Sequence, residues 1–350
     1  MENQTVSLML GGDVMLGRLV KDQINLLGPS YPLGTIAPVM RKPDLTIVNL
    51  ECAITSTNQR WQGWPKAFYF GAPPQAVQSL VEAGVDGVSL ANNHVLDFGV
   101  PGLRDTLRHL KQHGIGHAGA GENIDEALTP IYFERNGIKI GMVAYCDHQA
   151  DFAATEDAPG IAYLDLEDEV AAIEQFRSGL NRIKAATVDW PILSLHWGPN
   201  KVTRPSASFM RLAHAAIDMG YAILFGHSAH IFQVVEIYRG RPILYAAGDL
   251  VDDYYVDPKF KNDHQLLFEL TLDRTQLGRI DLYPIFIEDC RTVVASRHRF
   301  EYVARQITDL CAEMGTIVMR EGSSLWIEIG RTERGIGGLT HYLNETIMHI

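Results

Sequence analysis

The sequence predicts an α/β fold in which strands and helices alternate along most of the chain. Short apolar runs rich in Val, Ile and Leu are separated by longer amphipathic stretches, a pattern typical of buried strands joined by helices. Closely spaced strands with turn signals follow in the C-terminal part. With 350 residues, 46% of them hydrophobic, the chain can bury a substantial core.

In the N-terminal half, the apolar runs predict strands that stop at polar residues. The first strand, over residues 5–10, ends at Gly11 and Gly12, so that Asp13 lies at its junction with a helix over residues 14–27. The same reasoning predicts further strands over 45–50, 86–90 and 138–145, and a helix over 100–112. Function is therefore expected at the ends of strands.

The C-terminal half continues this alternation and then becomes richer in strands. Strands over 191–195 and 221–225 deliver His196 and His227, and each follows a predicted helix, over 166–185 and 206–219. The segments QVVEIYRG, RPILYAAGD and HQLLFELTLD predict antiparallel hairpins with turns at RG and DRTQLG. A last helix is expected over 301–314, and the glycine-rich stretch past Gly330 is expected to be partly disordered.

Charge and cysteine content argue against several classes of protein. The formal net charge of −12 argues against nucleic acid or an anionic membrane as a partner, because both require clustered Lys and Arg. The four cysteines lack the paired spacing of zinc ribbons and disulfide oxidoreductases. Without a basic leader or an apolar run of about 20 residues, we expect a cytoplasmic protein that does not span a membrane; its oligomeric state stays open.

Five polar clusters each follow a short apolar strand, and we expect a single sheet to present them all at one edge. The clusters are GGDVMLGR, NLE, ANNHVLD, HWG and GHSAH. Each alone has an ordinary explanation, such as a turn at Gly-Asp or a helix cap at Asn92 and Asn93. Their joint placement favours one site that gathers seven side chains: Asp13, Glu51, Asn93, His94, His196, His227 and His230.

This site is predicted to bind metal. Carboxylate, amide oxygen and imidazole form a ligand set that suits Mn, Fe or Zn, and no thiol is placed to favour a softer metal. The available ligands outnumber the four that a structural zinc uses. Two divalent ions that share a bridging carboxylate are therefore favoured.

The order of these clusters resembles the capsule-synthesis CapA family, also called the poly-gamma-glutamate synthesis family. The resemblance runs from about Val6 to Asp253 through GDVMLGR, NLE, SLANNHVLDFG, LSLHWG, GHSAHIFQ and YAAGDL. That family is similar to calcineurin-type metallophosphoesterases, which implies a four-layer α/β/β/α sandwich with a two-metal site between the sheets. Residues 1–290 would form this domain, residues 291–330 would add a helix and strand packed on it, and residues 331–350 would be a tail.

The resemblance also implies a role for each candidate residue. The first metal would be held by Asp13 and His230, the second by Asn93, His196 and His227, and Glu51 would bridge them. His94 would protonate the leaving group, a task that suits imidazole near neutral pH, and Asp97 would orient it. The candidate substrate-binding residues, which would face an anionic group, are Arg18, Lys66 and Asn92.

The sequence departs from both patterns in a few places. Met15 stands where the phosphoesterases usually have a metal-binding His, which leaves the first metal one ligand short. The three-residue step from His227 to His230 is one residue longer than in the phosphoesterases. Within the CapA pattern the replaced positions, which affect substrate preference, are Asn200, Ser228, Ala229 and Asp249.

Together these patterns predict a metal-dependent hydrolase. Metal-activated water would act on a phosphoester or on a glutamyl-type amide of a small molecule or peptide, in line with a role in poly-gamma-glutamate metabolism. One alternative is a peptide epimerase, in which the metals polarise a carbonyl while a base removes the adjacent α-proton. The other is a non-catalytic subunit of poly-gamma-glutamate synthesis or export.

Overall fold

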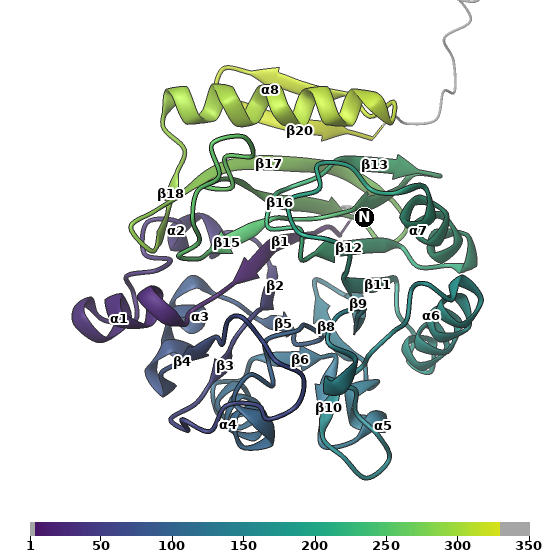
Figure 1. The fold of residues 1–350 in the computed structure, drawn as a ribbon. Helices are drawn as coiled ribbons and strands as arrows, with labels where there is room; N and C mark the ends of the chain where they lie inside the picture. The colour runs from purple at the N-terminus through teal and green to yellow at the C-terminus, as the bar shows by residue number, and fades with distance from the viewer. Residues whose placement is uncertain (1–3, 330–350) are drawn as a thin grey trace, which may run out of the picture.

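Two β-sheets packed face to face form the centre of the protein, and helices cover both outer sides (Figure 1). The computed structural model describes residues 4–329, so the expected disordered tail over 331–350 lies outside the described residues. The described part contains one sheet of ten strands, one of six, and two short strand pairs. The four-layer α/β/β/α sandwich implied by the resemblance is confirmed.

The ten-stranded sheet is parallel on one side of its first strand and antiparallel on the other. Its parallel strands are β1 (Val6–Val14), β2 (Leu45–Leu50), β5 (Gly87–Ser89) and β6 (Gly116–Ala118). The antiparallel side contains β16 (His264–Leu272), β17 (Leu277–Glu288), β20 (Ser324–Glu328) and β19 (Val318–Glu321). Two short strands pair with β1 and β17 respectively: β15 (Asp249–Val251) and β18 (Arg291–Val294).

The six-stranded sheet supplies the facing layer. Its parallel strands are β9 (Ile138–Cys146), β11 (Trp190–His196), β12 (Ile223–His227) and β14 (Arg241–Leu244). Antiparallel strands lie at its two edges: β8 (Ile131–Arg135) and β13 (Val235–Tyr238). The sheets come close at Gly87, where a Cβ would press on the ring of Phe133 in β8.

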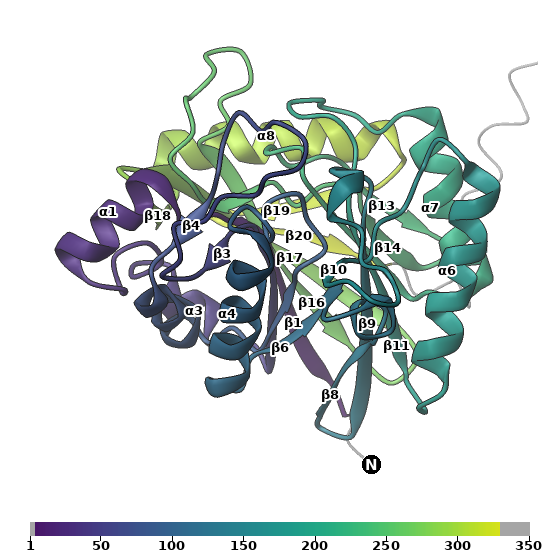
Figure 2. The ribbon, with the colours of Figure 1, turned by 60° about the horizontal axis from the view of Figure 1, so that its bottom comes forward.

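Helices cover the two outer faces, as the two views show (Figures 1 and 2). The six-stranded sheet is covered by α6 (Glu169–Lys184) and α7 (Ala207–Met219). Over the antiparallel strands of the larger sheet lies α8 (Arg297–Glu313), which begins four residues before its predicted start. Beside the parallel strands lie α1 (Arg18–Leu27), α2 (Ala37–Met40), α3 (Val77–Ala83) and α4 (Gly99–Gln112).

Short elements complete the loops. They are β3 (Ala53–Ile54), β4 (Gly71–Ala72), β7 (Ala120–Gly121), β10 (Gly160–Ile161), α5 (Ile124–Ala127), η1 (Pro74–Ala76) and η2 (Ala150–Phe152). Over residues 4–329, no helix combines the length and the apolar character that crossing a bilayer requires.

The N-terminal strand is longer than its sequence predicts. Strand β1 continues through Gly11, Gly12 and Asp13 to Val14, so α1 begins at Arg18 instead of residue 14. Gly12 serves a close approach and not a turn, because a Cβ there would overlap the carbonyl oxygen of Gly248. That carbonyl accepts a hydrogen bond of 2.9 Å from the Asp13 N–H. Asp13 therefore lies inside a strand, with Asp249 of β15 as its register partner.

The five polar clusters lie on two sheets, and the prediction of a single sheet edge is wrong. Strands β1, β2 and β5 carry three clusters on the larger sheet, whereas β11 and β12 carry two on the smaller. Hydrophobic periodicity identifies a strand but does not say which sheet it joins. The clusters still meet, because the carboxyl ends of both sets of parallel strands converge where the sheets pack together.

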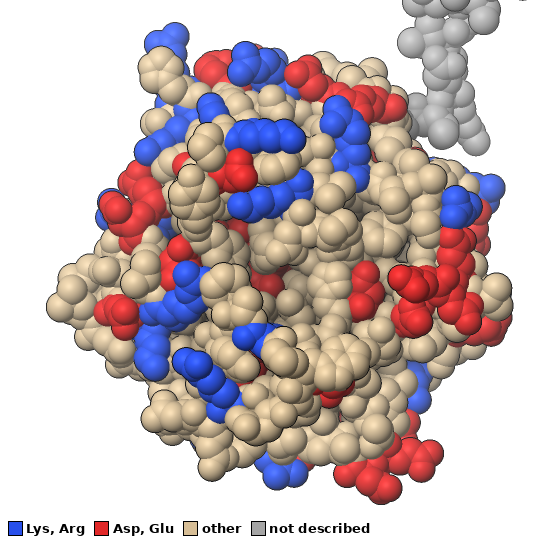
Figure 3. All heavy atoms as spheres, in the orientation of Figure 1, with Lys and Arg blue, Asp and Glu red and all other residues tan. Residues whose placement is uncertain are grey.

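Charged side chains are unevenly spread over the outer layers. On the face drawn in Figure 3, acidic groups gather beside α6 and α7, and basic groups lie over α8. Basic and acidic groups also alternate elsewhere on this face. The acidic groups buried between the two sheets are separate from this surface charge.

Replacing Gly12 with Ala tests the close approach of β1 and β15. We expect Gly12→Ala to lower the free energy of unfolding by about 3 kcal/mol, because the added methyl meets backbone that cannot rotate away. Chemical denaturation of the metal-free protein measures this. Gly278→Ala is the matched control, since the nearest atom to its Cβ, the Thr271 carbonyl oxygen, is 3.4 Å away. Equal unfolding free energies for the two variants would refute the prediction.

Candidate metal centre

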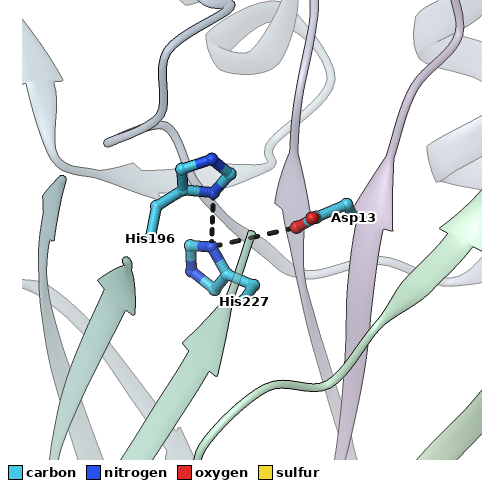
Figure 4. Close-up of side chains that lie close together, drawn as sticks. All are labelled: Asp13, His196 and His227. Atoms are coloured by element: carbon cyan, nitrogen blue, oxygen red, sulfur yellow. Dashed lines mark hydrogen bonds and ion pairs between the residues drawn. The ribbon is translucent and has the colours of Figure 1, made fainter. Parts of the chain in front are cut away.

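The ends of strands from both sheets bring carboxylates and imidazoles together in the interior. Asp13 lies in β1, and His196 and His227 are the last residues of β11 and β12. Figure 4 shows Asp13 facing the two rings from the opposite sheet. His227 Nδ1 lies 3.8 Å from Asp13 Oδ1 and 2.9 Å from His196 Nδ1. All three side chains are at most 1% exposed, so water screens their charges little.

Two overlapping groups of side chains have the spacing needed to hold a metal ion. In each group, the candidate ligand atoms lie within 4.8 Å of one another. The groups are Asp13 with His196 and His227, and Asp13 with Glu51, His230 and Asp249. Asp13 is thus common to both groups, the place that the resemblance gives to Glu51. Glu51, a member of the second group, also lies near the first, since its Oε1 is 3.7 Å from His196 Nε2.

The loop after β5 supplies an amide ligand and its support. Asn93 Oδ1 lies 3.0 Å from His196 Nε2, which places this amide beside the group that contains His196. Asn92 is fully buried, and its side-chain oxygen accepts from the N–H groups of His94 and Val95, each at 3.0 Å. Its side-chain amide donates to the carbonyl oxygen of Leu50 at 2.8 Å. Asn92 therefore holds the loop, and its expected contact with substrate is not supported.

His94 is held by a network of fixed contacts. Its Nδ1 lies 2.6 Å from Asp97 Oδ2, and its ring stacks on Phe70 with 3.7 Å between ring centroids. The ammonium group of Lys66 lies 2.7 Å from Asp97 Oδ1 and donates to the carbonyl oxygen of Asn93. Only 5% of the Lys66 side chain is exposed. The Lys66 ammonium group therefore contacts groups of the protein itself, and the structure gives no support to its expected role as a substrate ligand.

The segment that carries Lys66 also contacts the side of the smaller sheet. Trp61 Nε1 donates to Asp151 Oδ2 at 2.7 Å, and the Lys66 ammonium lies 4.6 Å from the ring centroid of Phe152. Both partners belong to η2, which follows β9. This segment, residues 56–69, thus connects the loops of the two sheets beside His94.

Arg18 is the substrate-binding candidate that stays accessible. Its side chain is 34% exposed, and its Nε lies 3.4 Å from Asp253 Oδ2. The guanidinium lies 5.0 Å from the ring centroid of Phe68 and 5.9 Å from that of Phe70. Because Phe70 stacks on His94, Arg18 lies one aromatic ring away from the candidate proton donor.

Burial opposes the charged form of three carboxylates and two histidines at this site. It raises the pKa of Asp13 to about 6, and it raises the pKa of Glu51 and of Asp249 well above their usual values, with Asp13 adding repulsion to each. It lowers the pKa of His227 to about 3 and that of His94 to about 4. The site thus combines the neutral imidazoles of His94 and His227 with buried carboxylates.

Two carboxylate oxygens show what this cluster lacks. Glu51 Oε1 and Asp249 Oδ2 are buried and accept no hydrogen bond from an N–H group of the described residues, and the neighbour of Asp249 is a second buried carboxyl group, that of Asp252. An unpartnered buried carboxylate is costly, and a divalent cation compensates it directly. The donor set and the orphaned oxygens therefore both fit a metal ion held between the two sheets.

Two further residues lie at the site: Tyr254, and Asp249, which the sequence marks only as a replaced position of the CapA pattern. Asp249 follows an apolar run and a glycine, as Asp13 does, and this repeated pattern could have identified it. Tyr254 gives no such signal. Its hydroxyl donates to Glu51 Oε2 at 3.3 Å, and its ring meets His230 edge-on at 4.9 Å between centroids.

The two departures around the metal ligands have local explanations. Met15 is fully buried, and its sulfur accepts a hydrogen bond from the Gly17 N–H at 3.1 Å. Ser228 and His230 both have positive φ values, 99° and 57°, so the loop after β12 turns sharply between its two histidines. This turn also lets the Ser228 N–H donate to Asp13 Oδ2 at 3.2 Å.

The family described as "Bacterial capsule synthesis protein PGA_cap" matches residues 7–254. The chain belongs to this family. It is 28% identical to the capsule biosynthesis protein CapA of Bacillus anthracis over 254 residues, which are 72% of this chain and 61% of that protein. It is 30% identical to a probable polyglutamine synthesis accessory protein of Mycobacterium tuberculosis, with 91% of this chain and 95% of that protein covered.

This PGA_cap chain therefore spans less than two thirds of the Bacillus anthracis relative and almost all of the mycobacterial one. A putative 5'-nucleotidase from Staphylococcus aureus is 16% identical, with 87% of this chain and 58% of that chain covered and a TM-score of 0.46.

The raised pKa of Asp13 predicts how metal binding depends on pH in this PGA_cap protein. Asp13 must lose its proton to bind a cation, so protons compete with metal below the pKa of about 6. We expect affinity to fall at least about tenfold for each pH unit below 6. Titration of the metal-free protein with Mn²⁺ or Zn²⁺ between pH 5 and 8 measures this, and a constant affinity across the range would contradict it.

Proposed function

We propose that this protein is a metal-dependent hydrolase that acts on a phosphoester or a glutamyl-type amide carrying an anionic group. The observation that carries the proposal is the buried cluster around Asp13, with orphaned carboxylate oxygens, beside the hydrogen-bonded pair His94 and Asp97. Metal ligands and a proton-transfer group at one site are what metal-assisted hydrolysis requires.

The ligand set supports a two-metal centre. Two divalent ions, with Mn, Fe and Zn as the best matches to these donors, would activate water and polarise the bond to be broken. The residues that would hold them are Asp13, Glu51, Asn93, His196, His227 and His230. Asn49 supports this set, since its amide donates to Asp13 Oδ1 at 2.7 Å and fixes the carboxylate.

His94 is suited to move a proton at its Nε2. Because burial lowers the pKa of His94 to about 4, its ring is neutral at pH 7, and Nδ1–H donates to Asp97. Nε2 is then the free acceptor. We propose that Nε2 takes the proton released by the attacking water and passes it to the leaving group. Lys66 lies 2.7 Å from Asp97 Oδ1 and so fixes the position of the carboxylate that orients the ring.

Arg18 and the names of the relatives support an anionic substrate. Arg18 is a partly exposed cation beside the rings that flank His94, where it would bind a carboxylate or phosphate. The relatives from Bacillus anthracis and Mycobacterium tuberculosis are named for capsule and polyglutamine synthesis. We therefore place γ-glutamyl amides beside phosphodiesters as the first substrates to test.

One observation favours a second candidate, a metal-dependent peptide epimerase. A neutral His94 with a free Nε2 can also remove the proton next to a polarised peptide carbonyl. Incubation of a γ-glutamyl peptide in deuterated water separates the two reactions. Deuterium at the α-carbon of uncleaved peptide would support epimerisation, and cleavage without such exchange would support hydrolysis.

Metal content is the direct test of the proposed centre. We expect purified wild type to carry about two divalent ions per chain. Glu51→Gln and His227→Ala should each lose metal, because they remove a buried ligand. Glu82→Gln, on the exposed end of α3, is the control and should bind metal like wild type. A wild-type protein that takes up no metal even after equilibration with Mn²⁺ and Zn²⁺ would refute the proposal and leave a binding role.

Substitution of His94 tests its part in proton transfer. We expect His94→Asn to lower kcat by about 10²- to 10⁴-fold without changing metal content, because it removes the proton acceptor and leaves the ligands in place. Asp97→Asn should have a smaller effect, about 10- to 100-fold, since it disturbs only the orientation and tautomer of the ring. His113→Asn, at the end of α4, serves as the control. Full activity in His94→Asn would exclude this role.

A further inference from the structure

The two groups that share Asp13 differ in their ligand atoms. On one side, Glu51 and Asp249 contribute carboxylates and His230 a single imidazole. On the other side, His196 and His227 contribute imidazoles, with the amide oxygen of Asn93 beside them. The first group is therefore rich in charged oxygen, and the second is rich in nitrogen.

The spacing around Asp249 fits a shared metal ion. His230 Nδ1 lies 2.9 Å from Asp249 Oδ1 and 3.5 Å from Asp13 Oδ2. Two atoms bound to one ion at about 2.1 Å lie roughly 3.0 to 3.4 Å apart in octahedral or tetrahedral geometry. Asp249 is fully buried, and its Oδ2 finds no N–H donor in the described chain, where its neighbour is the buried carboxyl group of Asp252. Glu51 Oε1, in the same group of candidate ligands, is buried and accepts no hydrogen bond from any described residue, and this is the independent sign that the group holds a cation.

Backbone pairing explains why Asp249 lies at the site. Asp249 is the register partner of Asp13 across the parallel strands β1 and β15. Partner residues of paired strands point to the same face of a sheet, so the two carboxylates lie side by side. The contact between Gly12 and Gly248 fixes this pairing one residue earlier. Met15, by contrast, directs its sulfur to the Gly17 N–H.

We propose that Asp249 is a ligand of the first metal, in place of the histidine absent at position 15, and that it makes this site selective for a hard cation. Carboxylate oxygens suit Mn²⁺ and Mg²⁺, whereas imidazoles suit Zn²⁺. The two positions therefore bind different ions, Mn²⁺ beside Asp249 and Zn²⁺ beside His196 and His227. This inference rests on the proposed two-metal centre and adds which ion each side takes.

The competing explanation is that Asp249 only orients His230. Asp263 and His264 form such a pair elsewhere, with 2.7 Å between Oδ1 and Nδ1. The substitution Asp249→Asn separates the two roles, because the amide oxygen still accepts a hydrogen bond from His230 but carries no charge for the metal. Asp263→Asn is the matched control, since it makes the same change in a pair outside the centre.

The test equilibrates metal-free protein with Mn²⁺, Zn²⁺ or both, and measures bound Mn²⁺ by electron paramagnetic resonance and both metals by elemental analysis. We expect wild type and Asp263→Asn to take up one ion of each kind. Asp249→Asn should bind Mn²⁺ more than about 100-fold more weakly, beyond the loss typical of a group that only orients a ligand, and should keep its Zn²⁺. Thermal unfolding of metal-free Asp249→Asn shows whether the variant folds. We expect its unfolding temperature to exceed that of metal-free wild type, because Asn places no charge at this buried position.

The outcomes distinguish this inference from the proposed function. If wild type binds two Zn²⁺ in preference to Mn²⁺, or if Asp249→Asn binds Mn²⁺ as wild type does, the role of Asp249 is refuted while the metal centre stands. If wild type binds neither ion, the centre and the inference fail together.

Discussion

Buried negative charge at the junction of the two sheets is the constraint on which the site depends. Asp13, Glu51 and Asp249 lie in the interior, and neither His196 nor His227 offsets their charge, because burial lowers the pKa of His227 to about 3 and opposes protonation of His196. Bringing carboxylates together in a medium of low polarity is unfavourable unless a cation joins them. The fold thus creates a demand for positive charge that the surrounding side chains do not meet.

A small number of structural features bring the residues of the site together. Parallel strands of each sheet end at the same place, and face-to-face packing brings the two sets of ends together. A glycine-to-glycine contact sets Asp13 beside Asp249, and a left-handed turn at Ser228 and His230 directs both histidines of the β12 loop to the cluster. The positive φ values of these two residues carry a conformational cost, roughly 1 to 3 kcal/mol each, that the surrounding packing offsets.

Local patterns and motifs in the sequence predict most residues of this site. The positions of the other residues depend on contacts between segments that are far apart in the sequence. His196 and His227 are predictable because an apolar strand leads directly into each of them. Asp249 follows an apolar run and a glycine as Asp13 does, but its position beside Asp13 depends on the parallel pairing of β15 with β1, which joins segments more than 200 residues apart. The contacts of Lys66 with Asp97 and Asn93 are not predictable from the sequence for the same reason, since they are set by the path of a long loop.

The contacts of Lys66 have a consequence for how the site is assembled. One ammonium group binds both Asp97, which orients His94, and the main chain of Asn93, whose side chain lies beside His196. Displacement of the segment 56–69 would therefore disturb the proposed proton-transfer pair and the proposed metal ligands in a single event. The two parts of the proposed site are thus held by the same contact, so neither is expected to form without the other.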